Sequence, residues 1–156
     1  MTMKNLIQSA LVGLLSGYAE RAQALWAEFG EQVRVPGFKT NSSYATLGAT
    51  KFIFVLATGA YAANQATNAT SSTLLGVLQN DPAVGEAMQI AASGLSKVVA
   101  GGALTVNNII TTNSSGRAAA VASGQMAAGR VLEAAGADGD VVTALLFHPV
   151  RWTGAA

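Results

Sequence analysis

From residue 51 onward the sequence breaks into short apolar runs separated by turn-forming residues, and this pattern restricts the fold more than any other feature. Each run has the length of a β-strand, and the separators, predicted to be turns, at residues 80–82, 93–94, 113–116 and 137–140 are rich in Gly, Asn, Asp and Ser. Many short strands at regular spacing predict a mainly β domain, a small antiparallel β-sandwich or barrel, over residues 51–150. The predicted strands are residues 51–57, 73–79, 86–91, 95–100, 108–112, 118–121, 125–132 and 140–147. The run at residues 51–57 is continuously apolar after Lys51, so we expect this strand to be buried on both faces.

Two of these strand pairs resemble each other. Residues 77–88 and residues 131–142, 54 positions apart, each run from a strand through a Gly-acid turn, at 85–86 and 139–140, into a second strand. One interpretation is that both copies form similar hairpin corners on one sheet. The other is a chance match, because short motifs recur easily in so simple a composition.

The first 30 residues have a different periodicity. Apolar residues between positions 3 and 29 recur every three or four residues, which places them on one face of an amphipathic helix. Gly13 and Gly17 weaken the middle of this predicted arm, and Gly30 ends it. The apolar stripe either packs on the chain's own β domain or docks on a neighbouring subunit. Residues 31–50, with Pro36-Gly37 and no sustained period, predict an extended linker or strap, and residues 151–156 a short tail.

The charge content is unusually low. Hydrophobic residues make up 51% of the chain and charged residues only 11%, against about 25% in a typical soluble domain. So few charges give a lone monomer little protection from association, so we expect a subunit covered by copies of itself or by a partner. The net charge is +1 without a basic cluster, which argues against nucleic acid as a partner. Gln8 and Ser9 interrupt the amino-terminal apolar stretch, so we expect neither a signal peptide nor a membrane span.

Residues that could carry catalysis are sparse. The chain has no cysteine, and its single histidine, His148, has no acid or second histidine at a metal-ligand spacing. The acids Glu86, Glu133, Asp138 and Asp140 fall at turn positions, where carboxylates accept hydrogen bonds from nearby backbone N–H groups. Residues 138–140 lack the ligands of a calcium loop, and residues 100–103 lack the Gly-Lys ending of a phosphate loop. We therefore expect no enzyme, no cofactor and no metal.

The turns and strands together resemble a known family. The stretches 76–87 (GVLQNDPAVGEA), 93–103, 114–118 and 129–140 (GRVLEAAGADGD) are similar, in this order, to the capsid cement, or head decoration, proteins of tailed bacteriophages. The resemblance covers roughly residues 50–148. It implies a small β domain, commonly a homotrimer, that is made in the bacterial cytoplasm and sits on the outer surface of the virion. There it binds between subunits of the major capsid protein and stiffens the shell.

The resemblance does not include residues 1–50, so candidates for a capsid or oligomer interface come from apolar spacing alone. We expect the large side chains of the arm and strap to act as anchors, because an amphipathic helix docks on a partner through apolar and aromatic residues spaced along one face. These candidates are Leu11, Leu14, Leu15, Tyr18, Leu25, Trp26, Phe29, Phe38 and Tyr44. The alternatives are a tail or head-completion component of the same virus, and a surface adhesive β-domain protein.

Overall fold

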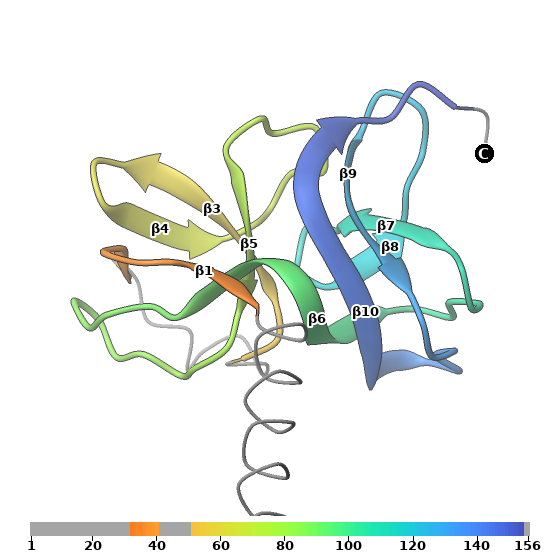
Figure 1. The fold of residues 1–156 in the computed structure, drawn as a ribbon, viewed down its shortest axis with the longest axis horizontal. Coiled ribbons are helices and arrows are strands. Elements are labelled where there is room, and N and C mark those ends of the chain that lie inside the picture. Colours follow the sequence, from red (N-terminus) through yellow and green to blue (C-terminus); the bar gives the residue numbers. More distant parts are fainter. Residues whose placement is uncertain (1–31, 41–50, 155–156) are drawn as a thin grey trace, which may run out of the picture. The chain divides into compact units, whose positions relative to one another are not determined.

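The computed structural model describes residues 32–40 and 51–154. The chain divides into two compact units, residues 1–31 and 32–156, and every described residue belongs to the second. The predicted helix over residues 1–30 therefore lies outside the described residues. The described part forms strands and no helix, which confirms the expectation of a mainly β domain (Figure 1).

Ten strands make up the described domain. They are β1 (Val33–Val35), β2 (Lys39–Thr40), β3 (Phe54–Gly59), β4 (Ala62–Gln65), β5 (Leu74–Leu78), β6 (Ile90–Gly101), β7 (Ile109–Thr112), β8 (Ala118–Ala120), β9 (Met126–Val131) and β10 (Asp138–Arg151).

The second half of the domain closes into a barrel. Its strands follow the order β10-β9-β7-β8-β6, and β6 pairs with β10 again, which closes the ring. Closure removes the free sheet edges that would otherwise be open to another chain. One contact in the ring, between β6 and β8 at Ala100 and Ala118, is parallel, whereas the sequence predicted an antiparallel arrangement. A second parallel contact joins β2 to β4.

The first half follows the same plan. Strands β4, β3, β5 and β6 lie side by side, β1 pairs with the start of β6, and β2 pairs with β4. Because β1 and β2 are separated only by residues 36–38, they act together as one strand that pairs with β6 at one end and β4 at the other. This strand closes the first barrel. Strand β6 belongs to both barrels, since Ile90–Ser93 pair within the first and Gly94–Gly101 within the second.

Two hydrophobic clusters fill the domain. Ile53, Val55, Leu78 and Ile90 form the inside of the first barrel. Phe54, on the opposite face of the same strand, belongs with the second barrel's core. The sequence run at residues 51–57 was predicted to be buried on both faces, and Ile53, Phe54 and Val55 confirm this with fully buried side chains.

Three local predictions differ from the structure. Residues 86–89 lie outside the strands because the Asn80 side chain takes the place of a strand partner, donating to Ala87 O at 2.9 Å and accepting from Gln89 N at 2.9 Å. The predicted turn at 93–94 is bridged by β6, which has partner strands on both sides of Gly94. The described part of the predicted linker or strap is more than a connection, since it holds β1 and β2, which pair with β6 and β4.

The internal resemblance reflects a repeated hairpin geometry. Phe52 N donates to Leu78 O at 2.7 Å, and Leu78 N donates to Ile53 O at 2.9 Å. The second barrel repeats this pair with Asn107 N to Val131 O at 2.8 Å and Val131 N to Asn108 O at 2.9 Å. Phe52 and Asn107 also share a positive φ, at 63° and 72°, which few non-glycine residues adopt.

The acidic turns match as well. Glu86 Oε2 accepts from Ala83 N at 2.9 Å, and Asp140 Oδ2 accepts from Ala137 N at 2.9 Å. Each acid therefore satisfies the backbone of its own turn, as predicted from the sequence. Together with the matching strand order, these contacts show that the two barrels repeat one motif. The hydrogen bonds make Leu78 the counterpart of Val131, so the strand register differs by one residue from the 54-residue spacing, which pairs Val77 with Val131.

Candidate interaction surfaces

Of the nine candidate anchors, Phe38 lies within the residues that the structure describes. It is half-buried, packs against the core of the first barrel and lies 6.3 Å from the Tyr61 ring, centroid to centroid. The other candidates, Leu11, Leu14, Leu15, Tyr18, Leu25, Trp26, Phe29 and Tyr44, fall outside the described residues.

The polar groups form local contacts. His148 is exposed on β10, with Nδ1 3.2 Å from Pro149 O. Asp138, predicted to bond to turn backbone, instead receives a 2.7 Å hydrogen bond from Arg117 and so ties the β7–β8 turn to the start of β10. Among residues 32–40 and 51–154, no three His, Cys, Asp or Glu residues gather where they could hold a metal ion. No helix in the described part of the chain has the length and apolarity to cross a membrane.

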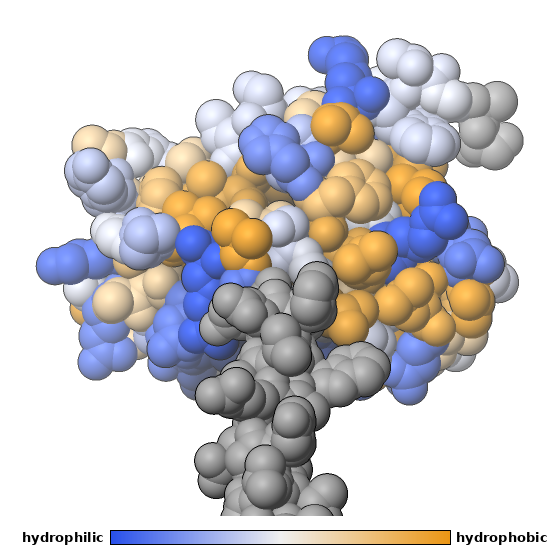
Figure 2. Space-filling model, viewed as in Figure 1, coloured by the Kyte–Doolittle hydropathy of each residue, from blue (hydrophilic) through white to orange (hydrophobic). Residues whose placement is uncertain are grey.

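The three exposed leucines of the described residues, Leu95, Leu132 and Leu145, lie on or beside β10. We call this surface, made by Leu95, Arg130, Leu132, Val141 and Leu145, the β10 face. Leu95 and Leu145 are paired across β6 and β10 and are 46% and 43% exposed. Figure 2 shows hydrophobic residues along β10, interrupted by hydrophilic ones. An exposed apolar cluster rimmed by polar groups is typical of a binding surface.

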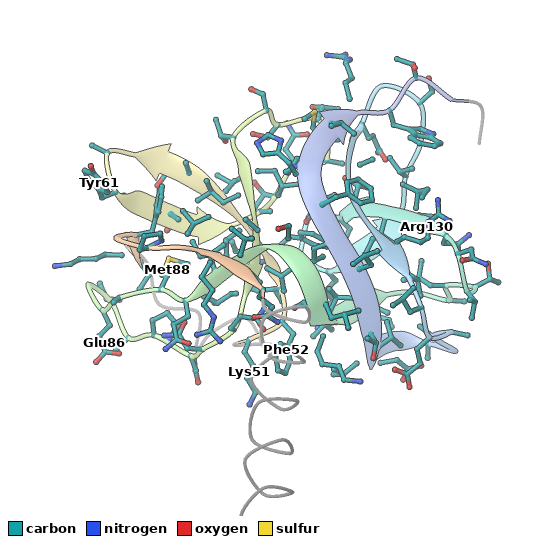
Figure 3. The ribbon with its side chains drawn as sticks, in the orientation of Figure 1. Lys51, Phe52, Tyr61, Glu86, Met88 and Arg130 are labelled. Atoms are coloured by element: carbon teal, nitrogen blue, oxygen red, sulfur yellow. The ribbon has the colours of Figure 1, made fainter. Side chains whose placement is uncertain are left out.

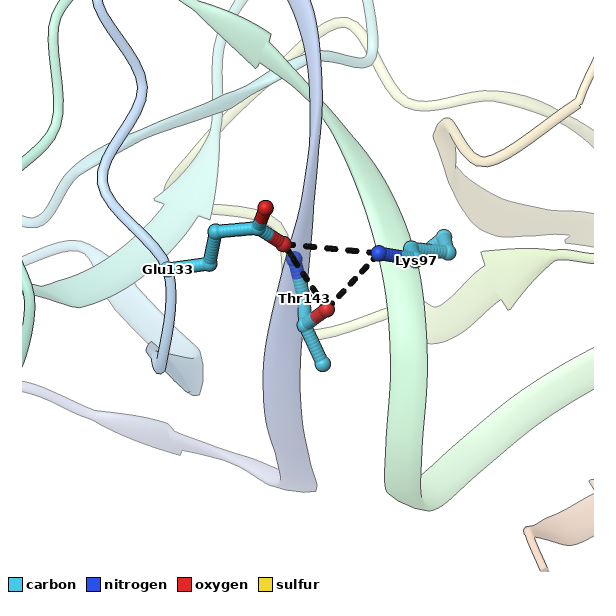
Figure 4. A network of polar contacts seen from close by, with 3 residues as sticks. All are labelled: Lys97, Glu133 and Thr143. Carbon is cyan, nitrogen blue, oxygen red and sulfur yellow. Dashed lines mark hydrogen bonds and ion pairs between the residues drawn. The ribbon is translucent and has the colours of Figure 1, made fainter.

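A small polar network borders this face (Figure 4). Glu133 Oε2 accepts from Thr143 N at 3.1 Å and from Thr143 Oγ1 at 3.0 Å, and Lys97 Nζ lies 3.4 Å from the same oxygen. Lys97 Nζ also donates to Thr143 Oγ1 at 2.8 Å. The two Thr143 hydrogen bonds, aided by Lys97, stabilise the carboxylate and lower the pKa of Glu133 below its ordinary value of 4.5. The network joins β6 and β10 to the chain following β9.

The lowered pKa predicts a pH effect on stability. Ionised Glu133 stabilises the fold fully above its ordinary pKa, and this contribution is lost as the pH falls through the lowered value. We expect Glu133→Gln to lower the urea midpoint near neutral pH and the gap from wild type to shrink on acidification below about pH 4.5. Asp81→Asn, at another exposed acid, is the control for loss of one negative charge. An equal, pH-independent loss in both variants would contradict this assignment.

A second exposed feature lies at the turn between β3 and β4. Tyr61 is 71% exposed and has a φ of 53°, so the turn presents an aromatic ring from a backbone conformation that tyrosine seldom adopts. Figure 3 shows Tyr61 and Arg130 on opposite sides of the described domain. We call the β3–β4 turn with Tyr61 and its neighbour Phe38 the Tyr61 corner.

Apart from Phe38, the residues of these two surfaces were not among the sequence candidates. The available signal for the β10 face was the alternation in its strand, where both Val141-Thr143-Leu145 and Val142-Ala144-Leu146 are apolar enough to be buried. A strand with two apolar faces but only one inside a barrel leaves the other for a partner. For Tyr61 the sequence carried no comparable signal.

Comparison with known proteins gives a fold match. No protein-family model matches the chain, and no curated protein matches it either. Among solved structures, it is similar to the N base of head fiber gp8.5 from bacteriophage phi29. The TM-score is 0.53 at 20% identity, and the match covers 74% of this chain and 94% of that one. The two share a fold.

Proposed function

We propose that this chain is a structural protein of a tailed-phage head. The observation that carries the proposal is the fold match to the N base of a head fiber, which spans nearly all of that chain. The independent resemblance of residues 50–148 to capsid cement proteins supports the same assignment. Both point to a role in binding, without a chemical step.

The more specific role that we propose is that of a cement protein. The chain binds the outer surface of the capsid between major capsid protein subunits, after synthesis in the host cytoplasm, and associates with itself, as a homotrimer by the family resemblance. The low charge content and the exposed apolar β10 face support a role in repeated surface contacts. Burial of apolar area contributes about 25 cal/mol per Å², so a modest contact repeated around a shell adds up to a large stabilisation.

A second candidate role is favoured by the same fold match. The related structure is described as the base of a head fiber, so this chain is alternatively a base that holds a projecting element on the head. A fiber base and a cement protein both require binding to the capsid. They differ in whether the capsid gains stability and in how many sites are filled.

Binding to heads tests the proposal. We expect the purified full chain to bind heads that lack it, to saturate at roughly hundreds of copies, and to raise the temperature at which the heads release DNA. Heads that already carry the protein are the control, and they should take up little more. About six or twelve copies per particle would instead indicate a ring at one vertex. Saturable binding to the heads without any rise in the temperature of DNA release would favour the fiber base. Absence of binding would reject a head protein altogether.

A further inference from the structure

Each barrel has a row of side chains at equivalent positions on three neighbouring strands. The row is buried in the first barrel and largely exposed in the second. In the first barrel, Phe54, Val77 and Ala91 lie side by side across β3, β5 and β6, and all three are fully buried. We call them the covered row. In the second barrel the same positions of β7, β9 and β10 hold Ile109, Arg130 and Leu145. Ile109 is half-buried, while Arg130 and Leu145 are exposed. We call these three residues, together with Leu95 on β6, which is paired with Leu145, the open row.

The second barrel is what covers the first row. Phe54 N donates to Gly116 O, in the β7–β8 turn, at 2.6 Å. Met126 N, at the start of β9, donates to Ala69 O at 2.7 Å, and the side chains of the covered row join the core cluster of the second barrel. The internal interface is thus a sheet face of one barrel set against the β7–β8 turn and neighbouring strands of the other.

The turn that makes this contact has a counterpart in the first barrel. Gly116 lies at a φ of 70° between β7 and β8, and Tyr61 lies at a φ of 53° between β3 and β4. Gly116 is inside the domain, whereas Tyr61 is on the outside with its ring exposed. Among the described residues, the domain therefore ends on one side with a sheet row that no other strand or turn covers, and on the other with an exposed turn. Within the domain each type of surface already pairs with the other.

We propose that the open row of one chain binds the Tyr61 corner of a second copy of the same chain. This contact repeats between chains the interface that joins the two barrels within a chain. Within the chain Gly116 meets Phe54, which is paired with Val77. By analogy Tyr61, the counterpart of Gly116, meets Ile109, and Arg130 is paired with Ile109 on the neighbouring strand. The Arg130 guanidinium is thus next to the aromatic ring, whose face it can bind. Leu145, Leu95 and Ile109 supply the apolar area around this pair.

The proposed contact is head-to-tail, since the two surfaces are different and lie on opposite sides of the domain (Figure 3). Such a heterologous contact leaves each chain able to bind one neighbour on either side, which gives rings or open chains. The inference concerns contacts between copies and does not rest on the capsid role. It remains testable if the chain never binds a head.

Cysteine cross-linking tests the contact directly, because the chain has no cysteine of its own. The full-length variants Ala60→Cys and Leu132→Cys place thiols beside the proposed Tyr61–Arg130 pair and leave the pair itself intact, since both positions are exposed. They are mixed and treated with a short bismaleimide, and we expect a cross-linked dimer in the mixture and at least tenfold less in either variant alone. Val106→Cys, an exposed site outside both surfaces, replaces Leu132→Cys in the control mixture. No dimer in the mixture, or equal dimer with the control, would overturn the proposal.

A second measurement separates head-to-tail binding from other self-association. Leu145→Glu removes the open row and Tyr61→Asp removes the corner, so we expect each variant alone to show a lower mass in sedimentation than wild type. When the two are mixed, the intact row of one meets the intact corner of the other, and the mass should rise to that of a one-to-one dimer. Unchanged thermal melting shows that both variants fold. Unaltered mass in both variants, or failure of the mixture to associate, would overturn the head-to-tail contact.

Discussion

Gly76→Ala is expected to destabilise the β domain by at least about 3 kcal/mol and to lower its melting temperature by roughly 10 °C. Gly76 lies on β5 at a φ of 152°, and a Cβ built there would overlap the Ala91 carbonyl oxygen and lie 2.8 Å from the carbonyl carbon. Both atoms belong to the backbone of β6, which is paired on both sides and has no free space to move into. Urea denaturation of the full chain measures the loss.

Gly102→Ala is the matched control for this prediction. Gly102 has nearly the same φ, 153°, but a Cβ there has no heavy atom within 4 Å. Its alanine variant therefore carries the backbone strain without the clash, a cost of about 1–3 kcal/mol. The difference between the two variants isolates the close approach of β5 to β6. Equal losses would show that φ alone makes position 76 require glycine.

The sequence predicted well those features that depend on neighbouring residues. The turns at Glu86 and Asp140 followed from acids placed where backbone N–H groups need partners, and both carboxylates accept those bonds. The burial of Ile53, Phe54 and Val55 followed from the continuous apolar run that contains them. The repeat was visible because β5 with β6 and β9 with β10 each use the same local order of strand, acidic turn and strand.

Features set by contacts distant in sequence were missed. Strand β4 consists of Ala62–Gln65, whose Ala and Asn residues have little strand preference, and it exists because β3 and β2 pair with it on either side. Glycine is common in turns and Gly94 therefore predicts one, yet β6 continues through it because partner strands pair with β6 before and after this residue. Which face of β10 points outward depends on closure of the second barrel, and a single strand does not encode that closure.

The candidate site shows the same division. The candidate anchors were chosen from the spacing of apolar residues on a predicted helix, and such spacing is a local property of the sequence. Most of those residues lie outside the described part. The β10 face and the Tyr61 corner are recognised only when the two barrels are compared. Comparison matters because exposure of Leu145 is unremarkable alone, but its counterpart Ala91 is fully buried under another barrel.

Phe54→Ala is expected to cost about 3–5 kcal/mol, the range for removing a buried aromatic ring. Phe54 is fully buried and lies in the cluster that joins the first barrel to the second, so its loss leaves a cavity at the junction. Because both barrels share β6, loosening this junction is expected to lower the stability of the whole domain in one transition. Thermal and urea unfolding followed by circular dichroism measure the effect.

Ile109→Ala is the control, since Ile109 occupies the equivalent position in the second barrel. Its side chain is half-buried and no barrel of the same chain covers it, so we expect a loss of only about 1 kcal/mol when the protein is dilute. If copies associate through the open row, the loss should grow with protein concentration, because association stabilises the folded state by mass action. The stability lost in Phe54→Ala should not depend on protein concentration, because the contacts of the Phe54 side chain all lie within one chain. A loss for Ile109→Ala as large as for Phe54→Ala at low concentration would mean that the two rows are equally covered, and the asymmetry between the barrels would be wrong.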